Sequence, residues 1–385
     1  MHRTVFDENH ETFRATLRIF IEKEVVPVYR EWEEQGHPPR NFYRRLGELG
    51  TLGIGVPEEF GGGGEASFKF QAVVIEETAR AGVSLGGYSV HANMILPYLL
   101  TYASDEQKSR WLPGFTSGDI LTAIAMTEPG TGSDLANVQT RATLSNDGTH
   151  YLLNGAKTFI TSGTLADLVL VVARTTPFDP QDRRAGLSIL CVETDSPGFV
   201  VGRKLDKIGL KASDTAELFF TDIQVPMENL LGEAGQAFSY LSHNLAQERL
   251  TIALGAAAAA EAAVRFTTDY VTNRTVFGKP IAHFQNTKFV LAECATEVEA
   301  ARVFADRALE VFDAGELSIV DAAKAKLFCS EVAGRVIDKC LQLHGGYGYI
   351  TEYPIARLYA DTRVSRIFGG TSEVMKTIIA KSLGL

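Results

Sequence analysis

The sequence predicts an α+β protein of several domains: an N-terminal α-helical domain (1–120), a middle antiparallel β-barrel or sandwich domain (121–231) and a C-terminal four-helix bundle (232–385). The chain has 385 residues, more than one ordinary core holds, since a domain usually takes about 100 to 200 residues. Strand-type patterns are confined to the middle segment, and helix-type patterns occupy both ends. A helical, then all-β, then helical order is uncommon and narrows the choice of fold.

The N-terminal segment carries helical patterns interrupted by turn residues, such as Pro38-Pro39 and the step from Pro57 into the glycines 61–64. Four glycines can cradle a phosphate, but no lysine follows them and no strand precedes them, which favours a plain loop. The stretch "YSVHANMILPYLL" (88–100) is apolar enough to line a cavity or to form core.

The middle segment changes to short strands. "RATLSNDGTHYLLNG" contains an Asp147-Gly148 turn between alternating runs, a strong hairpin signal. "LADLVLVVART", "GLSILCVET" and "AELFFTDIQV" follow, each rich in Val, Leu, Ile or Phe and bounded by turn residues. These runs predict a small pair of antiparallel sheets or a barrel.

The C-terminal segment is periodic at helical spacing. Its four apolar-patterned stretches are 233–273, 283–313, 318–344 and 353–383. Glycine and proline separate them, as a bundle of long antiparallel helices requires.

Composition indicates a soluble globular protein, with 45% hydrophobic and 22% charged residues. The net charge of −10 argues against a nucleic-acid partner, so an anionic ligand would need a local site. The four cysteines lack the spacing of zinc or redox motifs, which favours reduced thiols and no bound metal. No secretory leader is visible, and the apolar run near 250–260 is too short to span a bilayer. We therefore expect a cytoplasmic, bacterial-type protein without a membrane span; a mitochondrial matrix protein trimmed of its leader stays open.

An acid interrupts the apolar stretch "NLAQERLTIALGAAAAA" (244–260). Steps of three and four residues place Glu248 on the same helical stripe as Leu245 and Ile252. Arg249 points about 100° away from Glu248 and cannot be its partner on the helix surface. A carboxylate on an apolar stripe is costly unless it is paired, hydrogen-bonded or protonated. From the residues alone, a functional acid and a helix rotated toward water or a buried arginine both stay open.

Several short motifs combine small residues with turns. "MTEPGTGSDL" (126–135) offers backbone amides that can lie against a polar ring or a phosphate. The others are "KTFITSG" (157–163), "RTVFGKPIAHFQ" (274–285), "LQLHGGYGYITEYPIARLYAD" (341–361) and "RIFGGTSE" (366–373).

Together and in this order, these stretches resemble the acyl-CoA dehydrogenase family over essentially the whole chain. The resemblance implies bound FAD and a coenzyme A thioester substrate, in fatty acid β-oxidation or related lipid metabolism. A carboxylate would remove the α-proton while the β-hydride passes to flavin N5, giving trans-2-enoyl-CoA. An electron-transferring flavoprotein would then accept the electrons.

The resemblance also implies the residues of the site. Along the flavin ring it places residues in and just before the first motif, namely Ile124, Met126, Thr127, Gly132 and Ser133, and on the other side Phe159, Ile160 and Thr161. A clamp on the FAD phosphates and adenosine is implied for Arg274, Phe277, Gln285, Gln342, Gly345 and Gly346. Much of such a clamp comes from a neighbouring subunit, so a homotetramer built as a dimer of dimers is expected. Thr371 and Ser372 would complete the FAD pocket, and Ser133, Arg249 and Gly370 would contact the substrate.

Two positions depart from the commonest pattern. Phe159 stands where many members have tryptophan, and Gly369 stands where many carry the catalytic glutamate. In the long-chain and isovaleryl branch the base lies on the long helix instead, in a step like Glu248-Arg249-Leu250. The resemblance therefore implies Glu248 as the base, with the Gly369 N–H and a flavin ribityl hydroxyl as donors to the thioester carbonyl.

Alternatives stay open within this resemblance. An acyl-CoA oxidase would differ only in passing electrons to oxygen, and a non-catalytic acyl-CoA or flavin-binding scaffold would have lost its base at Gly369. Medium to long straight acyl chains are the first expectation, since the small residues 255–260 could leave depth for a tail, although alanines also serve close helix packing. Short branched chains and a carrier-bound thioester are the other substrates considered.

Overall fold

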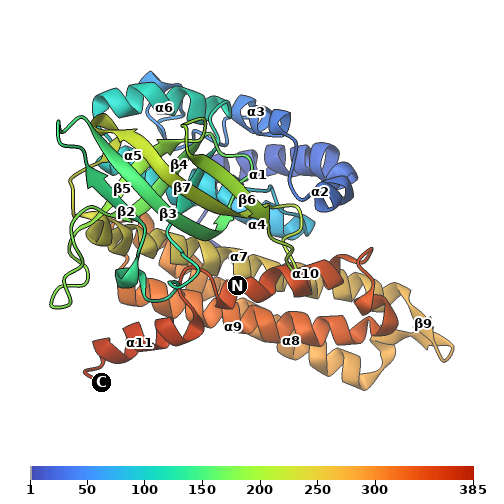
Figure 1. Ribbon diagram of the computed structural model, residues 1–385. Helices are drawn as coiled ribbons and strands as arrows, with labels where there is room; N and C mark the ends of the chain where they lie inside the picture. Colours follow the sequence, from blue (N-terminus) through green and yellow to red (C-terminus); the bar gives the residue numbers. More distant parts are fainter. Residues whose placement is uncertain (1) are drawn as a thin grey trace.

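The computed structural model describes residues 2–385, and its elements follow the expected order of helices, strands and helices (Figure 1). The N-terminal segment contains α1 (Glu8–Phe20), α2 (Tyr29–Gln35), α3 (Arg40–Glu48), α4 (Lys69–Ala81), α5 (Leu96–Tyr102) and α6 (Asp105–Ser117). A π-helical turn, Ser89–Ile95, leads into α5, so the apolar stretch 88–100 is helical and mostly buried. The glycines 61–64 form a loop, as expected.

The middle segment forms one eight-stranded sheet in the order β6-β7-β3-β2-β4-β5-β8, with β1 added beside β4. The strands are β1 (Thr122–Ala125), β2 (Arg141–Leu144), β3 (His150–Thr161), β4 (Leu168–Arg174), β5 (Leu187–Glu193), β6 (Phe199–Lys204), β7 (Thr215–Pro226) and β8 (Leu230–Leu231). The Asp147-Gly148 hairpin joins β2 and β3, and the Ser145 N–H donates to the His150 carbonyl at 2.9 Å.

The sequence predicted purely antiparallel strands, but the sheet is mixed, because it also contains parallel pairs. Strand β1 runs parallel to β4, and one residue of β2 also pairs with β4 in parallel. Between β1 and β4 the chain makes the whole β2–β3 hairpin, and such a long connection permits parallel pairing.

The C-terminal segment contains α7 (Ala237–Asn273), α8 (Gln285–Asp313), α9 (Ile319–Leu343), α10 (Pro354–Thr362) and α11 (Ser372–Ser382). A small ribbon of β9 (Thr275–Val276) and β10 (Lys279–Pro280) joins α7 to α8. The prediction of one helix over 353–383 was wrong, because Gly369 and Gly370 have φ of +62° and +95° and stop the helix between α10 and α11.

Helix α7 connects all parts of the molecule. It contacts α8 and α9 in its own segment, α4 of the N-terminal segment, and β5 of the sheet (Figure 1). Its alanines 256–260 are buried, and small side chains allow such close approach of helices. By length and composition alone α7 could cross a membrane, but 72% of its most apolar window is buried inside the protein, as in the core helix of a soluble protein.

A buried ion network ties the N-terminal segment to α8. Glu76 on α4 accepts from Arg3 at 2.7 Å and from Arg14 and Arg302 at 2.8 Å each. Burial alone would raise the pKa of Glu76, but the hydrogen bond from Arg3 and the positive charges of Arg302 and Arg14 outweigh it and lower the pKa. The four cysteines are buried and unpaired, as expected for reduced thiols.

Candidate active site

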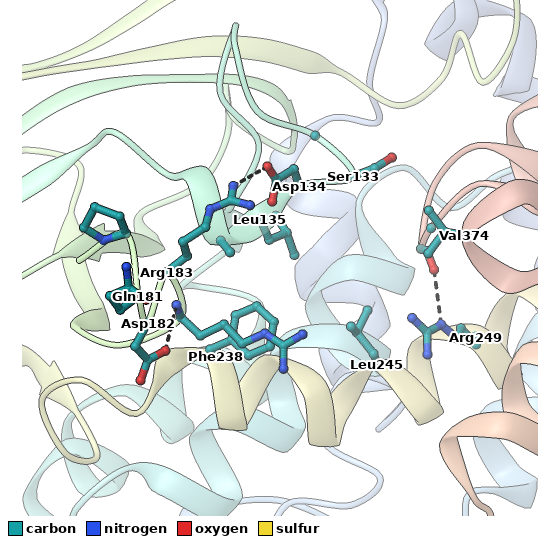
Figure 2. Close-up of a pocket in the computed structure, with 16 residues that line it drawn as sticks. Ser133, Asp134, Leu135, Gln181, Asp182, Arg183, Phe238, Leu245, Arg249 and Val374 are labelled. Atoms are coloured by element: carbon teal, nitrogen blue, oxygen red, sulfur yellow. Dashed lines mark hydrogen bonds and ion pairs between the residues drawn. The ribbon is translucent and has the colours of Figure 1, made fainter. Parts of the chain in front are cut away.

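A cavity of about 660 Å³ opens where the sheet meets the C-terminal helices (Figure 2). Two loops of the middle segment, 132–136 and 180–184, form one wall. Along the floor α7 contributes Phe238, Leu245 and Arg249, and the Gly369–Gly370 turn closes the end near Arg249. Segments far apart in the sequence therefore meet around one space.

Glu248 lies on α7 between Leu245 and Arg249, which line the cavity, and is itself buried behind that lining. It is 3% exposed, and its Oε1 atom has no hydrogen-bond partner among residues 2–385. Burial raises the pKa of its carboxyl to about 7, although the Arg249 charge and the Tyr98 hydroxyl both act to lower it. Glu248 is thus closed to bulk solvent, and no arginine of the described residues forms an ion pair with it.

Two further buried polar groups accompany Glu248. Tyr98 on α5 and Asn244, one turn earlier on α7, lie close enough for the Tyr98 hydroxyl to interact with both the Glu248 carboxyl and the Asn244 amide. Burial, followed by the charge of Glu248, raises the pKa of the Tyr98 phenol well above its usual range, so the phenol stays neutral. The sequence marked 88–100 as able to line a cavity but did not single out Tyr98.

The Gly369–Gly370 turn packs against the same stripe of α7. A Cβ built on Gly369 would lie 2.4 Å from Cδ1 of Ile252, which is one turn beyond Glu248. A side chain at position 369 would require the end of the Ile252 side chain to shift, and the positive φ would strain the backbone of any residue but glycine, so both features favour Gly369. The carboxyl group near this turn is Glu248, on the neighbouring helix.

Two buried cations hold this turn. Arg249 Nε donates to the Gly369 carbonyl at 3.4 Å, and Lys326 Nζ on α9 donates to the Gly370 carbonyl at 2.6 Å. Arg249 therefore points to one side of the apolar stripe, as its helical position predicts. Sequence reasoning missed Lys326, although a lysine among the apolar positions of a predicted helix is a signal of the same kind as Glu248.

The segment from β1 to β2 carries the first motif. Ile124 is buried in β1, the Met126 carbonyl accepts from Lys157 Nζ at 3.0 Å, and the Thr127 carbonyl accepts from the Thr158 N–H at 2.9 Å. Gly132 and Ser133 line the cavity. These bonds fix the loop against β3.

A buried ion pair that the sequence did not reveal supports this loop. Lys157 Nζ lies 2.9 Å from the Glu128 carboxylate, which also accepts from two backbone N–H groups, of Gln139 and Thr140. Burial lowers the pKa of Lys157 to about 8 in spite of the attraction of Glu128. The ion pair leaves the loop little freedom to move.

Strand β3 presents Phe159 through a bulge. The register with β7 shifts between Lys157 and Ile160, so one extra residue is inserted in β3, and Phe159 has φ of +60°. Bulges re-aim side chains, and Phe159 is 67% exposed. Ile160 is buried and can offer only its backbone to a ligand, whereas Thr161 is half-buried at the strand end.

The other predicted cofactor residues lie far from the cavity. Arg274 and Phe277 follow α7 near the β9–β10 ribbon, at the opposite end of the helices from α11 (Figure 1). Gln285 begins α8, and Gln342, Gly345 and Gly346 are at the end of α9. From Glu248 to Arg274 the axis of α7 extends for about 39 Å at about 1.5 Å per residue. One chain therefore does not bring the two sets together.

Arg274 and Phe277 are nonetheless built into a defined surface. The Arg274 guanidinium lies 5.3 Å from the ring centroid of Tyr347, and Phe277 is 95% exposed with φ of +50°. Thr371 caps α11 by accepting from the Val374 N–H, and the Ser372 hydroxyl donates to Glu331 at 2.7 Å. No group of three or more metal-binding side chains occurs among residues 2–385.

Comparison with known proteins fits this arrangement. Sequence models of the N-terminal, middle and C-terminal domains of acyl-CoA dehydrogenases match residues 7–119, 123–223 and 235–384. The long-chain specific mitochondrial acyl-CoA dehydrogenase of Sus scrofa is 44% identical over 381 residues, 99% of this chain and 88% of the pig protein. The chain belongs to the acyl-CoA dehydrogenase family.

Solved structures of the family have the same fold. An acyl-CoA dehydrogenase from Geobacillus kaustophilus superposes with a TM-score of 0.95 at 48% identity, covering 99% of each chain. A glutaryl-CoA dehydrogenase from Mycobacterium smegmatis, solved in complex with FADH2, has a TM-score of 0.90 at 29% identity and covers 98% of this chain and 95% of that one. The predicted three-domain fold and a flavoprotein acyl-CoA dehydrogenase of fatty acid metabolism are confirmed at the level of the family.

Proposed function

We propose that the protein is an FAD-dependent enzyme that converts an acyl-CoA thioester into trans-2-enoyl-CoA, with Glu248 removing the α-proton. The observation that carries this proposal is the buried Glu248 carboxyl, which forms no ion pair within residues 2–385 and has a pKa raised to about 7. A base whose pKa is near the working pH combines a useful ionised fraction with a strong pull on the proton.

The residues around the site fit an FAD cofactor. Phe159 and Phe277 are large aromatic side chains left exposed, and Cβ atoms built on Gly132, Gly345 and Gly346 would meet nothing within 4 Å, so the backbone there is open to a ligand. We propose that Phe159 and the backbone of Thr127 to Ser133 lie along the ring, with Thr161, Thr371 and Ser372 nearby. Bound FAD supplies the oxidant that accepts the β-hydride at N5.

The thioester carbonyl is polarised by the turn before α11. Within residues 2–385 the N–H of Gly369 is not used in a turn or loop hydrogen bond, so it is available to the carbonyl oxygen. Negative charge grows on that oxygen as Glu248 takes the α-proton. Removing one such donor typically costs about 3 to 4 kcal/mol of barrier.

Arg184 supports coenzyme A, or its phosphopantetheine part, as the thioester carrier. Its guanidinium lies in the cavity 4.8 Å from the ring centroid of Phe238, and no carboxylate within residues 2–385 pairs with it. Phe238 and Arg249 are about 16 Å apart along α7. An extended pantetheine arm of about twelve bonds equals about four residues of extended chain, or about 13 to 14 Å. A thioester at Gly369 would therefore place its phosphate near Arg184.

The thioester carrier is tested with truncated substrates. Arg184→Gln is expected to raise KM for acyl-CoA about tenfold, the loss of one charge-assisted hydrogen bond, and to leave KM for acyl-pantetheine unchanged. Arg203→Gln, an exposed change on β6, is the control. An equal rise in KM for both substrates would show that Arg184 does not bind the phosphate. A higher rate with an acyl carrier protein thioester than with acyl-CoA would show that the natural thioester carrier is a protein.

The reaction itself is tested by adding acyl-CoA to the FAD-loaded enzyme without oxygen. The flavin absorbance should bleach, and trans-2-enoyl-CoA should form in equal amount. Absence of bleaching with every chain length would contradict the proposal and favour the non-catalytic scaffold.

We propose an electron-transferring flavoprotein as the acceptor, and an oxidase is the alternative. The two differ in the fate of the reduced enzyme in air. Slow reoxidation by oxygen and fast reoxidation by the flavoprotein are expected, whereas rapid peroxide formation would identify an oxidase.

We also propose a homotetramer built as a dimer of dimers. The distant set around Arg274 and Phe277 would complete the FAD site of a neighbouring subunit, which explains why one chain separates it from the cavity. Phe277 and Tyr349 are 95% and 90% exposed, and such aromatic surface is expected at an interface. Analytical ultracentrifugation of the holoenzyme should give four times the chain mass; a monomer that binds FAD tightly would contradict this.

Medium to long straight acyl chains are proposed as substrates. The pig relative is long-chain specific by name. The alanines after Glu248 are fully packed in the core, so their small size serves close packing and does not by itself give depth for a tail. The kcat/KM values for a panel of acyl-CoA thioesters of different chain length test this proposal, and a clear preference for short branched chains would contradict it.

A further inference from the structure

Lys326 is a buried lysine that forms no ion pair with any carboxylate of residues 2–385. It lies on α9, is completely buried, and its Nζ donates at 2.6 Å to the backbone carbonyl of Gly370. Glu331 on α9 and Glu373 on α11 face it, but Glu331 is engaged by Ser372 and Arg366. Burying a charge in this way is costly unless the charge has a use.

Anchoring α11 does not require a cation. Thr371 caps the helix, and the Glu331 bonds to Ser372 and Arg366 already tie the turn to α9. A neutral donor would satisfy the Gly370 carbonyl equally well. The positive charge therefore calls for an explanation beyond helix anchoring.

A second cation converges on the same turn. Arg249 Nε donates at 3.4 Å to the carbonyl of Gly369, the residue immediately before. Two buried cations thus hold two consecutive carbonyls of a turn in which both glycines have positive φ. The peptide N–H of Gly369 keeps its direction only while this turn is fixed.

We propose that Lys326 is a positioning residue for the thioester carbonyl: with Arg249 it fixes the Gly369–Gly370 turn and places positive charge behind the Gly369 N–H. This inference rests on the proposed function. As the α-proton leaves, negative charge develops on the carbonyl oxygen, and a preorganised cation nearby stabilises that charge without further rearrangement. Lys326 does not touch the substrate and acts through the turn.

The charge state of Lys326 gives the proposal a second readout. Burial, and then the Arg249 charge from α7, lower the pKa of Lys326 to about 8, while Glu331 and Glu373 act to raise it. The ammonium is present below about pH 8 and is lost above it. The chemical step is therefore expected to fall at high pH with an apparent pKa near 8, separately from the fall at low pH that belongs to Glu248.

The test uses the FAD-loaded enzyme and a 3-thia-acyl-CoA. This probe has sulfur in place of the β-carbon, so it can lose the α-proton but no hydride, and its enolate gives a long-wavelength band beside the oxidised flavin. Lys326→Met should weaken this band and lower kcat by about 10- to 100-fold, the effect of a small misplacement, with KM nearly unchanged. It should also abolish the decline near pH 8. Lys326→Gln, a neutral donor, should recover part of the rate but not the pH dependence.

Lys324→Met is the matched control, since Lys324 is exposed on the same helix and pairs with Asp321. An unchanged enolate band and pH profile in Lys326→Met would overturn the inference. If Lys326→Met fails to hold FAD, the same two measurements are made on Lys326→Gln. A wild-type enolate band together with a wild-type decline near pH 8 in Lys326→Gln would equally overturn the inference. Failure of the wild-type enzyme to bleach with any acyl-CoA would instead overturn the proposed function.

Discussion

Glu76 and Glu248 are both buried glutamates, 5% and 3% exposed, but they have opposite surroundings. Glu76 is held by Arg3, Arg14 and Arg302, and its pKa is lowered. Glu248 has an arginine next to it in the sequence and yet forms no ion pair in the described part of the chain, and its pKa is raised to about 7. Burial by itself does not make a base; a buried carboxyl becomes one where counter-ions are kept away from it.

Helix geometry explains how the counter-ion is kept away. Neighbouring helical residues point about 100° apart, so Arg249 leaves the stripe of Glu248 and reaches the Gly369 carbonyl. The arginine holds the Gly369–Gly370 turn and forms no ion pair with Glu248. In the Glu76 network the arginines come from other elements and converge on the carboxylate.

The largest expected effect is on the rate after Glu248→Gln. Because Glu248 is the proposed base, anaerobic bleaching by acyl-CoA should slow by about 10⁴-fold, the upper range for general-base catalysis. FAD content should stay normal. Glu316→Gln, at an exposed loop position, is the control. A variant that bleaches at the wild-type rate would show that another group is the base.

Glu76→Gln should act on stability and hardly on rate. It removes the shared carboxylate of a network in which Arg3 keeps Asp306, Arg14 keeps Glu77 and Arg302 keeps Glu261, so the cost should stay at or below the about 3 to 5 kcal/mol of a fully broken buried pair. Thermal unfolding should shift to clearly lower temperature, whereas kcat of the remaining folded enzyme should stay within about threefold of wild type. A large loss of kcat with unchanged unfolding temperature would reverse the roles assigned to the two glutamates.

The pH dependence of stability should have opposite signs at the two sites. For Glu248 the folded-state pKa lies above the ordinary 4.5, so the native protein binds the extra proton and loses stability as pH rises from about 4.5 to 7. Glu248→Gln removes that loss, so its free energy of unfolding relative to wild type should rise by up to roughly 3 kcal/mol between these pH values. For Glu76, with a lowered pKa, the stabilisation is full above pH 4.5 and is lost as pH falls. Calorimetric unfolding over a pH series measures both, and parallel curves for the two variants would contradict the comparison.

The smallest expected effect comes from the Tyr98 hydroxyl. It helps to hold down the pKa of Glu248, so Tyr98→Phe should move the low-pH limb of kcat/KM to higher pH by at most about one unit. Tyr102→Phe, a half-buried neighbour on α5, is the control. A shift to lower pH would show that the hydroxyl does not face the carboxylate.

Much of the architecture could be predicted because its signals are local. The hairpin at Asp147-Gly148, the strand runs and the long apolar helices follow from turn residues and periodicity. A turn was predicted within 366–373, but the helical segment 353–383 was drawn across it, because a period of three to four residues continues on both sides and only the backbone conformation shows that the helix stops. The parallel pairing of β1 with β4 depends on contacts between residues distant in the sequence, and local periodicity carries no information about such contacts.

The candidate site was predicted unevenly for similar reasons. Glu248 stood out as an acid on an apolar stripe, and the resemblance to the family supplied its role. Lys326, Tyr98 and the Glu128–Lys157 pair were missed, since each acts through a partner that is remote in the sequence. The cytoplasmic location, the tetramer and the individual roles of the cofactor residues stay predictions.

The most direct test of the account is the titration of Glu248 itself. Infrared difference spectra of the wild-type enzyme minus Glu248→Gln isolate the C=O stretch of the protonated Glu248 carboxyl. The account predicts that this band disappears with a midpoint near pH 7. A midpoint near the ordinary value of 4.5, or no difference between the two proteins, would contradict it.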